Sequence, residues 1–296
     1  MLEMFEMEFM QRAWLAGFIM AIICPLIGSF LVLRRQSLIG DGLGHIAFAG
    51  VAGGALCGYS PVLSAACATI LGALAIERVR TRLADAADMV LAIFFYSGMG
   101  LAVIFTSINK DGGFNLSSVL FGSLMTVSGR DLAIVAALGL CTVIFVALYY
   151  RPLQYLTFDE TSARVAGLPV DKLNMLLAML TALTVALSMR IVGLLLVSAM
   201  MVIPVACALQ TARSFAGTIV QGIGYGVAAV AVGLTASYYL NLAPGGAIVL
   251  AATLLFGFSF ILGRRTTGNK PAPEPCGHCA QCAECAEAGE EQKSES

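Results

Sequence analysis

Between residues 13 and 263, this 296-residue chain contains nine apolar segments separated by more polar connections, and most of the segments are long enough to cross a lipid bilayer. A membrane-spanning helix needs about 20 consecutive, mostly apolar residues. The segments are 13–33, 38–58, 60–77, 88–108, 131–150, 172–190, 191–210, 216–240 and 245–263. Segment 191–210 could instead pair with its neighbour as a broken hairpin, which would leave eight spans. The pattern therefore predicts an all-α polytopic membrane protein, a bundle of eight or nine transmembrane helices.

The charge content of the chain supports this fold class. Only 12% of the residues are charged, whereas a soluble domain carries roughly 25%. The net charge of −1 gives no reason to expect nucleic acid as a partner. The residues from Met1 to Glu8 are acidic where a signal peptide needs a basic start, so we expect the first apolar segment to be retained as a span.

The lysines and arginines indicate the orientation of the spans, because short connections rich in these residues stay in the cytoplasm. With the N-terminus outside, four of the 17 basic residues fall on the outer side, namely Arg12, Lys110, Arg130 and Arg190. The others fall on the cytoplasmic side, namely Arg34, Arg35, Arg78, Arg80, Arg82, Arg151, Arg164, Lys172, Arg213, Arg264, Arg265, Lys270 and Lys293. We therefore predict an N-terminus outside and a C-terminus in the cytoplasm.

The composition changes abruptly after Gly263, where the chain becomes polar and contains Pro271, Pro273 and Pro275. Such a composition cannot bury enough apolar surface to form a packed domain. We expect two parts, a transmembrane domain over 1–263 and a flexible, cysteine-rich cytoplasmic tail over 264–296.

Asp41 and His45 are ionisable residues within the second apolar segment, at a distance from its ends. Residues four apart lie on the same face of a helix. An ionisable side chain in a membrane span is costly and marks a functional site by default. Carboxylate and imidazole together suit zinc, manganese or iron(II), and a site with only two ligands would pass an ion rather than retain it. The alternative is that the two residues pair with each other or with a neighbouring helix for structure only.

Small residues surround this pair, which lets a helix approach its neighbours closely. They are Gly40, Gly42, Gly44, Ala47, Ala49, Gly50, Gly53 and Gly54. We therefore expect this span to lie inside the bundle or at a dimer seam rather than against lipid.

A short helix is predicted in the long polar connection between 151 and 171. Asp159 or Glu160 can lie near its N-terminus and Arg164 near its C-terminus, and Gly167 followed by Pro169 ends it. It could be a simple surface element.

Three segments carry recognisable motifs. The first, from Arg34 to Gly50, reads Arg-x-Gln-Ser-Leu-x-Gly-Asp-Gly-x-x-His-x-Ala-x-x-Gly. The second runs from Gly193 to Pro204, and the third is Glu160-Thr-Ser-Ala163-x-x-x-Gly167 in the connection between 151 and 171. Together they resemble the ABC-3 family, the zinc, manganese and iron permease subunits of ATP-binding-cassette importers, and the third is similar to the Glu-Ala-Ala-x-x-x-Gly coupling loop of ABC importers.

The resemblance implies roles for particular residues. Asp41 and His45 match the carboxylate and histidine of the family's metal path, although Gly44 stands where a serine would be expected. Asp159, Glu160, Ala163 and Gly167 would form the coupling helix that docks on an ATPase subunit. Because the chain has no Gly-x-x-x-x-Gly-Lys-[Ser/Thr] motif, the resemblance implies that it is no enzyme and that a separate subunit hydrolyses ATP.

The implied assembly is a homodimer with two copies of a cytoplasmic ABC ATPase and an extracytoplasmic metal-binding protein. It would lie among lipids in the plasma (inner) membrane of a bacterium and carry no covalently bound cofactor. Its cargo would be a divalent metal ion, with zinc as the first choice and manganese or iron as the others.

The tail contains a cluster of soft metal ligands, Cys276, His278, Cys279, Cys282 and Cys285. Four thiols and an imidazole within ten residues suit zinc or copper(I), and disulfides are disfavoured in a reducing cytosol. An iron–sulfur cluster fits less well, because the bacterial pattern has three residues before its last cysteine and a proline after it. We expect the tail to accept or sense imported metal; otherwise its cysteines have no metal role.

Two other classes of protein are alternatives. An intramembrane aspartyl protease would need glycine at position 38, where Leu38 stands, and a second acidic residue in mid-span; a rhomboid-type protease would need glycine in place of Phe95. An ion-driven secondary metal transporter is the stronger alternative, because Asp41 could carry protons. It would have no use for a coupling helix.

Overall fold

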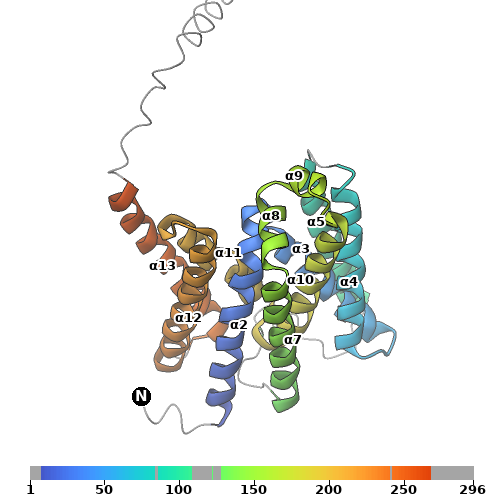
Figure 1. The fold of residues 1–296 in the computed structure, drawn as a ribbon. Helices are drawn as coiled ribbons and strands as arrows, with labels where there is room; N and C mark the ends of the chain where they lie inside the picture. The colour runs from blue at the N-terminus through green and yellow to red at the C-terminus, as the bar shows by residue number, and fades with distance from the viewer. Residues whose placement is uncertain (1–7, 84–85, 109–121, 123–127, 241, 268–296) are drawn as a thin grey trace, which may run out of the picture. The chain divides into compact units, whose positions relative to one another are not determined.

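The computed structural model describes residues 8–83, 86–108, 122, 128–240 and 242–267, and every regular element among them is a helix (Figure 1). Nine of these helices are long and apolar enough to cross a membrane. They are α2 (Glu8–Leu33), α3 (Ile39–Leu56), α4 (Pro61–Arg80), α5 (Ala87–Ile108), α7 (Gly129–Leu148), α10 (Val170–Val192), α11 (Leu194–Thr211), α12 (Phe215–Leu240) and α13 (Pro244–Thr267). The predicted all-α polytopic class is confirmed.

The segment predicted as 191–210 is a helix of its own rather than half of a broken hairpin. Gly193 separates α10 from α11 with φ +90°, a backbone conformation that glycine adopts without a steric penalty. By length and composition, the part of the chain that the structure describes therefore contains nine candidate spans rather than eight.

The inner helices are α2, α3, α10 and α11, in which more than half of the span is buried, against 22–28% in α4, α5 and α7. The chain divides after Phe260 into two units, and these helices pack together within the first unit. Helix α2 contacts α11, α12 and α7, while α3 contacts α4, α5, α10 and α11. The predicted position of α3 inside the bundle is confirmed.

Glycines allow these helices to approach closely. A Cβ atom on Gly28 of α2 would lie 2.0 Å from the backbone oxygen of Met201 in α11. A Cβ atom on Gly50 of α3 would lie 2.6 Å from the Ala68 Cβ in α4. Both distances are shorter than a van der Waals contact, so the present spacing of these helices requires residues without a side chain.

Two short helices lie between α7 and α10, namely α8 (Tyr150–Phe158) and α9 (Glu160–Val165). The predicted short helix is confirmed as α9. Helix α8 was missed, because the polar residues of this segment obscured its buried Leu153 and Leu156. Pro152 does not prevent it, since proline is tolerated in the first turn of a helix.

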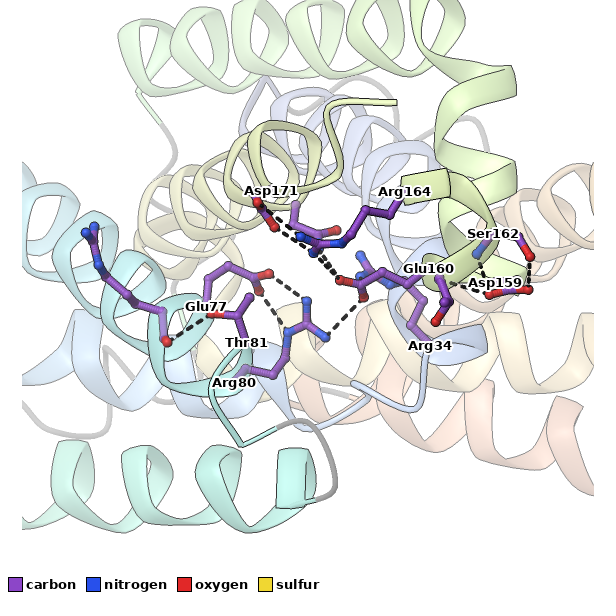
Figure 2. A network of polar contacts seen from close by, with 12 residues as sticks. Arg34, Glu77, Arg80, Thr81, Asp159, Glu160, Ser162, Arg164 and Asp171 are labelled. Atoms are coloured by element: carbon purple, nitrogen blue, oxygen red, sulfur yellow. Dashed lines mark hydrogen bonds and ion pairs between the residues drawn. The ribbon is translucent and has the colours of Figure 1, made fainter. Parts of the chain in front are cut away.

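The ion pairs join connections that the orientation prediction placed on the same side of the membrane. Arg34, Arg80 and Asp171 belong to one ion-pair network with α9 (Figure 2). Arg190, predicted to lie on the opposite side, is 3.8 Å from Asp131, which directly follows Arg130 of the same predicted side. The assignment of the α9 end to the cytoplasm stays a prediction.

Candidate metal path and coupling site

Asp41 lies in the first turn of α3, nearer the helix end than the sequence analysis placed it. The helix begins at Ile39, and the positive end of its backbone dipole favours a carboxylate at this position. The half-buried Asp41 lines a cavity of about 540 Å³ together with Ser37 and Leu38. The remaining wall comes from α11 and α13, namely Leu195, Leu196, Ser198, Ala199, Val202, Gly245, Gly246, Val249, Leu250 and Thr253. Among the described residues that line this mostly apolar cavity, Asp41 is the one carboxylate.

His45 lies one turn further along α3 and is also half-buried. Its ring packs edge-on against Phe95 of α5, with 4.7 Å between the ring centroids. Its Nδ1 atom is buried and has no hydrogen-bond partner among the described residues. His45 does not line the cavity of Asp41. The structure therefore places the two predicted residues on consecutive turns, with only Asp41 in the cavity wall.

The two side chains could serve as ligands for a passing divalent cation but do not form a closed cage. In the described ranges, no three or more His, Cys, Asp or Glu residues come together as a metal site would require. Carboxylate oxygen and neutral imidazole are acceptable ligands for zinc, manganese and iron(II) alike. What α3 can offer by itself is an incomplete site.

The packing of α11 explains why glycine rather than serine stands at position 44 in this chain. A Cβ atom there would lie 1.8 Å from Cδ1 of Leu194, the first residue of α11. Leu194 is only 2% exposed, so its side chain occupies the space that a serine would need. The departure from the family's expected serine is thus coupled to the packing of α11 on α3.

Asp159 begins α9 as its N-cap. Its carboxylate accepts hydrogen bonds from the backbone N–H groups of Thr161 (2.9 Å) and Ser162 (3.0 Å) and from the Ser162 hydroxyl. The Ser162 hydroxyl and then the Ser162 N–H hold the pKa of the Asp159 carboxyl below its ordinary value, because they stabilise the charged form. Capping of this kind satisfies N–H groups that have no partner within the helix.

The other residues predicted for coupling also lie on or beside α9. Ala163 is 1% exposed and packs in the core, which anchors the helix against the bundle. Gly167 has φ +79°, and its N–H donates to the Arg164 carbonyl at 3.1 Å. This left-handed glycine ends the helix as predicted.

Glu160 lies at the centre of an ion-pair network that the sequence analysis missed (Figure 2). Its carboxylate is 3.2 Å from Arg34, 3.7 Å from Arg80 and 3.7 Å from Arg164. Burial lowers the pKa of Arg34, as does the neighbouring Arg80, and Glu160 partly offsets this. The sequence did contain a sign of this network, because Arg34, Arg80 and Arg164 all lie in connections predicted to share one side of the membrane. These residues were used only to predict the orientation of the spans.

The candidate metal ligands of the tail, from Cys276 to Cys285, lie outside the described residues. Their role as an acceptor or sensor of metal stays a prediction.

Among the described residues, nine helices have membrane-spanning length and composition and a carboxylate-bearing cavity lies between α3, α11 and α13, which is the architecture of a multi-pass membrane protein. The sequence model of the ABC 3 transport family matches residues 6–263. The chain belongs to that family, and the resemblance noted from its motifs is confirmed.

Several membrane transport proteins are similar to this chain over most of its length. A probable metal transport system membrane protein of Treponema pallidum is 39% identical over 255 residues, which cover 85% of this chain and 94% of the relative. The manganese transport system membrane protein MntC of Halalkalibacterium halodurans is 30% identical and covers 87% of this chain and 88% of its own length. The solved structure of PsaBC from Streptococcus pneumoniae in complex with Fab matches with a TM-score of 0.76 and 29% identity, covering 87% and 92% of the two chains.

Proposed function

We propose that this chain is the membrane-spanning permease subunit of an ABC importer that moves a divalent transition-metal ion into the cytoplasm. The observation that carries the proposal is the position of Asp41 in the wall of the cavity between α3, α11 and α13, with His45 one turn further along. A divalent cation relieves the cost of a carboxylate in apolar surroundings by supplying the opposite charge.

Manganese is the cargo that we propose to test first, because two kinds of relative carry manganese in their names. Zinc remains the second candidate, favoured by the thiols of the tail from Cys276 to Cys285. A carboxylate and an imidazole bind both ions, and the softer thiolates favour zinc.

We further propose that two copies of the chain work with two ATPase subunits and an extracytoplasmic metal-binding protein. Helix α9 supports this proposal, because its capped and anchored structure gives a separate ATPase a firm element to move. In this scheme ATP-driven movement of α9 alternates access to Asp41, and the chain itself hydrolyses no ATP.

The test is metal uptake by the complete complex, with its ATPase subunits, reconstituted in liposomes. Asp41→Ala should abolish uptake of radioactive manganese, because the cavity loses its carboxylate, while the complex still assembles and binds ATP. Asp131→Asn is the matched control, since Asp131 is a carboxylate that pairs with Arg190 (3.8 Å) and belongs neither to the cavity wall nor to the network around α9. Unlabelled zinc, manganese and iron(II), added in turn as competitors, rank the cargo.

Normal uptake by Asp41→Ala would overturn the proposal. The same vesicles also test the secondary-transporter alternative. Uptake that needs ATP and persists after the proton gradient has been collapsed supports the ABC importer, and uptake that needs only the gradient supports the alternative.

A further inference from the structure

Glu160 joins the coupling segment to three other parts of the chain (Figure 2). Its carboxylate is 3.2 Å from the Arg34 Nη2 in the connection between α2 and α3, and 3.7 Å from the Arg80 Nη1 at the end of α4. It also accepts a hydrogen bond from the Asn174 Nδ2 in α10 at 3.3 Å. A movement of α9 therefore reaches these three segments through one side chain.

Of the residues that Glu160 contacts, Arg34 relies most on Glu160 as its ion-pair partner. The Arg34 side chain is only 6% exposed, and within the described residues its ion pairs include no carboxylate other than Glu160. Arg80, by contrast, also makes two hydrogen bonds with Glu77, at 2.6 and 3.0 Å. A buried guanidinium that loses its partner is strongly unfavourable. When Glu160 moves, Arg34 is therefore expected to move with it, because separation would leave its buried charge without a partner.

The connection that contains Arg34 also forms part of the Asp41 cavity. Ser37 and Leu38 lie in its wall, three or four residues after Arg34. The connection is held tightly, because the Gln36 N–H donates to the Leu31 carbonyl at 2.9 Å and the Gln36 carbonyl accepts from the Ile39 N–H at 3.1 Å. Displacement of Arg34 therefore shifts the cavity wall rather than being absorbed by a loose loop.

Gln36 gives the same connection a second link to the network. It is 3% exposed, and when its amide is turned so that the oxygen faces the guanidinium, this oxygen accepts from the Arg80 Nη1 (3.1 Å) and Nε (3.2 Å). Arg34 and Gln36 thus bind to the network from one side of the connection, while Ser37 and Leu38 line the cavity.

The outer face of α9 is exposed, although Arg164 on it pairs with Asp171 (2.9 Å). Val165 is 85% exposed and the Arg164 side chain 57% exposed, whereas Glu160 is only 33% exposed and its described contacts lie toward the bundle. An ATPase subunit can therefore contact α9 without displacing Glu160 from Arg34.

We propose that Glu160 is a positioning residue that transmits the movement of α9, through Arg34, to the connection 34–38 and hence to the Asp41 cavity. The inference rests on the proposed function, since it assumes that an ATPase moves α9 and that metal passes Asp41. It adds the path between the two sites, which runs through one carboxylate and one buried guanidinium.

The test compares ATP hydrolysis with metal uptake in the reconstituted complex. Glu160→Gln should lower uptake about tenfold, the size expected when coupling between two sites is weakened, while the complex still assembles and hydrolyses ATP. A merely structural role would lower hydrolysis and uptake together. Asp171→Asn is the matched control, because Asp171 pairs with Arg164 (2.9 Å) at the exposed edge of the network, and its uptake should be unchanged.

A second readout is the chemical reactivity of a cysteine in place of Ser37 in the cavity wall, which reports a movement of the wall. In a background with all nine native cysteines replaced, Ser37→Cys should react with a small maleimide at a rate that changes when ATP is added. With Glu160→Gln present, ATP should no longer change the rate. If Glu160→Gln does not assemble, Arg34→Lys takes its place, because lysine keeps the charge and alters the geometry. It is tested by the same two readouts, uptake relative to ATP hydrolysis and the response of the maleimide rate to ATP.

The outcomes separate this inference from the proposed function. Absence of metal uptake by the unaltered complex overturns the proposed function. Uptake by the unaltered complex, combined with normal uptake by Glu160→Gln and a maleimide rate that still responds to ATP, overturns the inference alone.

Discussion

At the scale of single residues, Asp159 determines where helix α8 ends and helix α9 begins. It follows the last residue of α8 and serves as the N-cap of α9, with extended backbone angles (φ −150°, ψ 100°). Its carboxylate holds the Thr161 and Ser162 N–H groups. Glu160 comes directly after this cap, so the capping bonds also fix the start of the chain segment that reaches Arg34.

Asp159→Ala should loosen the first turn of α9, because two N–H groups lose their acceptor. The measurement is hydrogen exchange of the Thr161 and Ser162 amides, which should become faster. Asp159→Asn is the matched control, since asparagine is an equally good capping residue.

The same cap should depend on pH in one direction. Because the pKa of Asp159 in the folded protein is lowered, its contribution is complete above the unfolded aspartate value of about 3.9. The contribution is lost as the pH falls through the lower, folded value. As the pH falls through this folded value, the two amides of the unaltered protein should lose protection relative to their intrinsic exchange rates, whereas those of Asp159→Asn should not. Equal loss of protection in both proteins would contradict the prediction.

At the scale of the helices, the inner bundle depends on backbones that lie closer than side chains allow. Gly28 brings α2 against α11, and Gly50 brings α3 against α4. Helix α11 supplies both the wall of the Asp41 cavity and the contact with Gly28. A change at the α2–α11 contact therefore acts on the site as well as on stability.

Gly28→Ala should destabilise the protein by about 1–3 kcal/mol, because the added methyl group meets a backbone oxygen that cannot rotate away. The measurement is the midpoint of thermal unfolding in detergent. Gly224→Ala in α12 is the matched control, because no other helix among the described residues comes within 4 Å of its Cβ position and alanine favours the helix. An unchanged midpoint for Gly28→Ala would show that α2 and α11 separate without cost.

At the scale of the whole molecule, the ion pairs fix which connections share an end of the bundle. Arg34, Glu160 and Asp171 belong to one network, and Asp131 and Arg190 form a separate pair. The excess of basic residues on the first set of connections predicts that their end faces the cytoplasm.

Labelling from the two sides of the membrane tests this orientation. In the cysteine-free background, Asp131→Cys should react with a membrane-impermeant maleimide in intact cells. Asp171→Cys, whose side chain is 70% exposed in the unaltered protein, should react only after the cells are made permeable. The opposite pattern would reverse the predicted orientation.

Features that depend on neighbouring residues could be predicted from the sequence. The length and composition of the apolar segments predicted eight or nine spans, and the structure decided between these numbers. The ends of α9 follow from Asp159 and Gly167, whose preferences act within a turn. The position of Asp41 and His45 one turn apart on one helix could be predicted for the same reason. Helix α8 was missed because its apolar residues become recognisable only once the core against which they pack is known.

The tertiary structure alone decided which distant residues meet. Arg34 and Glu160 are 126 positions apart, and Gly44 meets Leu194 across two different helices. Only the packing of the helices also put Asp41 in a cavity wall and turned His45 toward Phe95. Helix formation is a local property of the chain, whereas burial and ion pairing depend on where the helices pack. The sequence by itself therefore determined the spans, the capped helix and the candidate ligands, and the tertiary structure decided how α9 is connected to them.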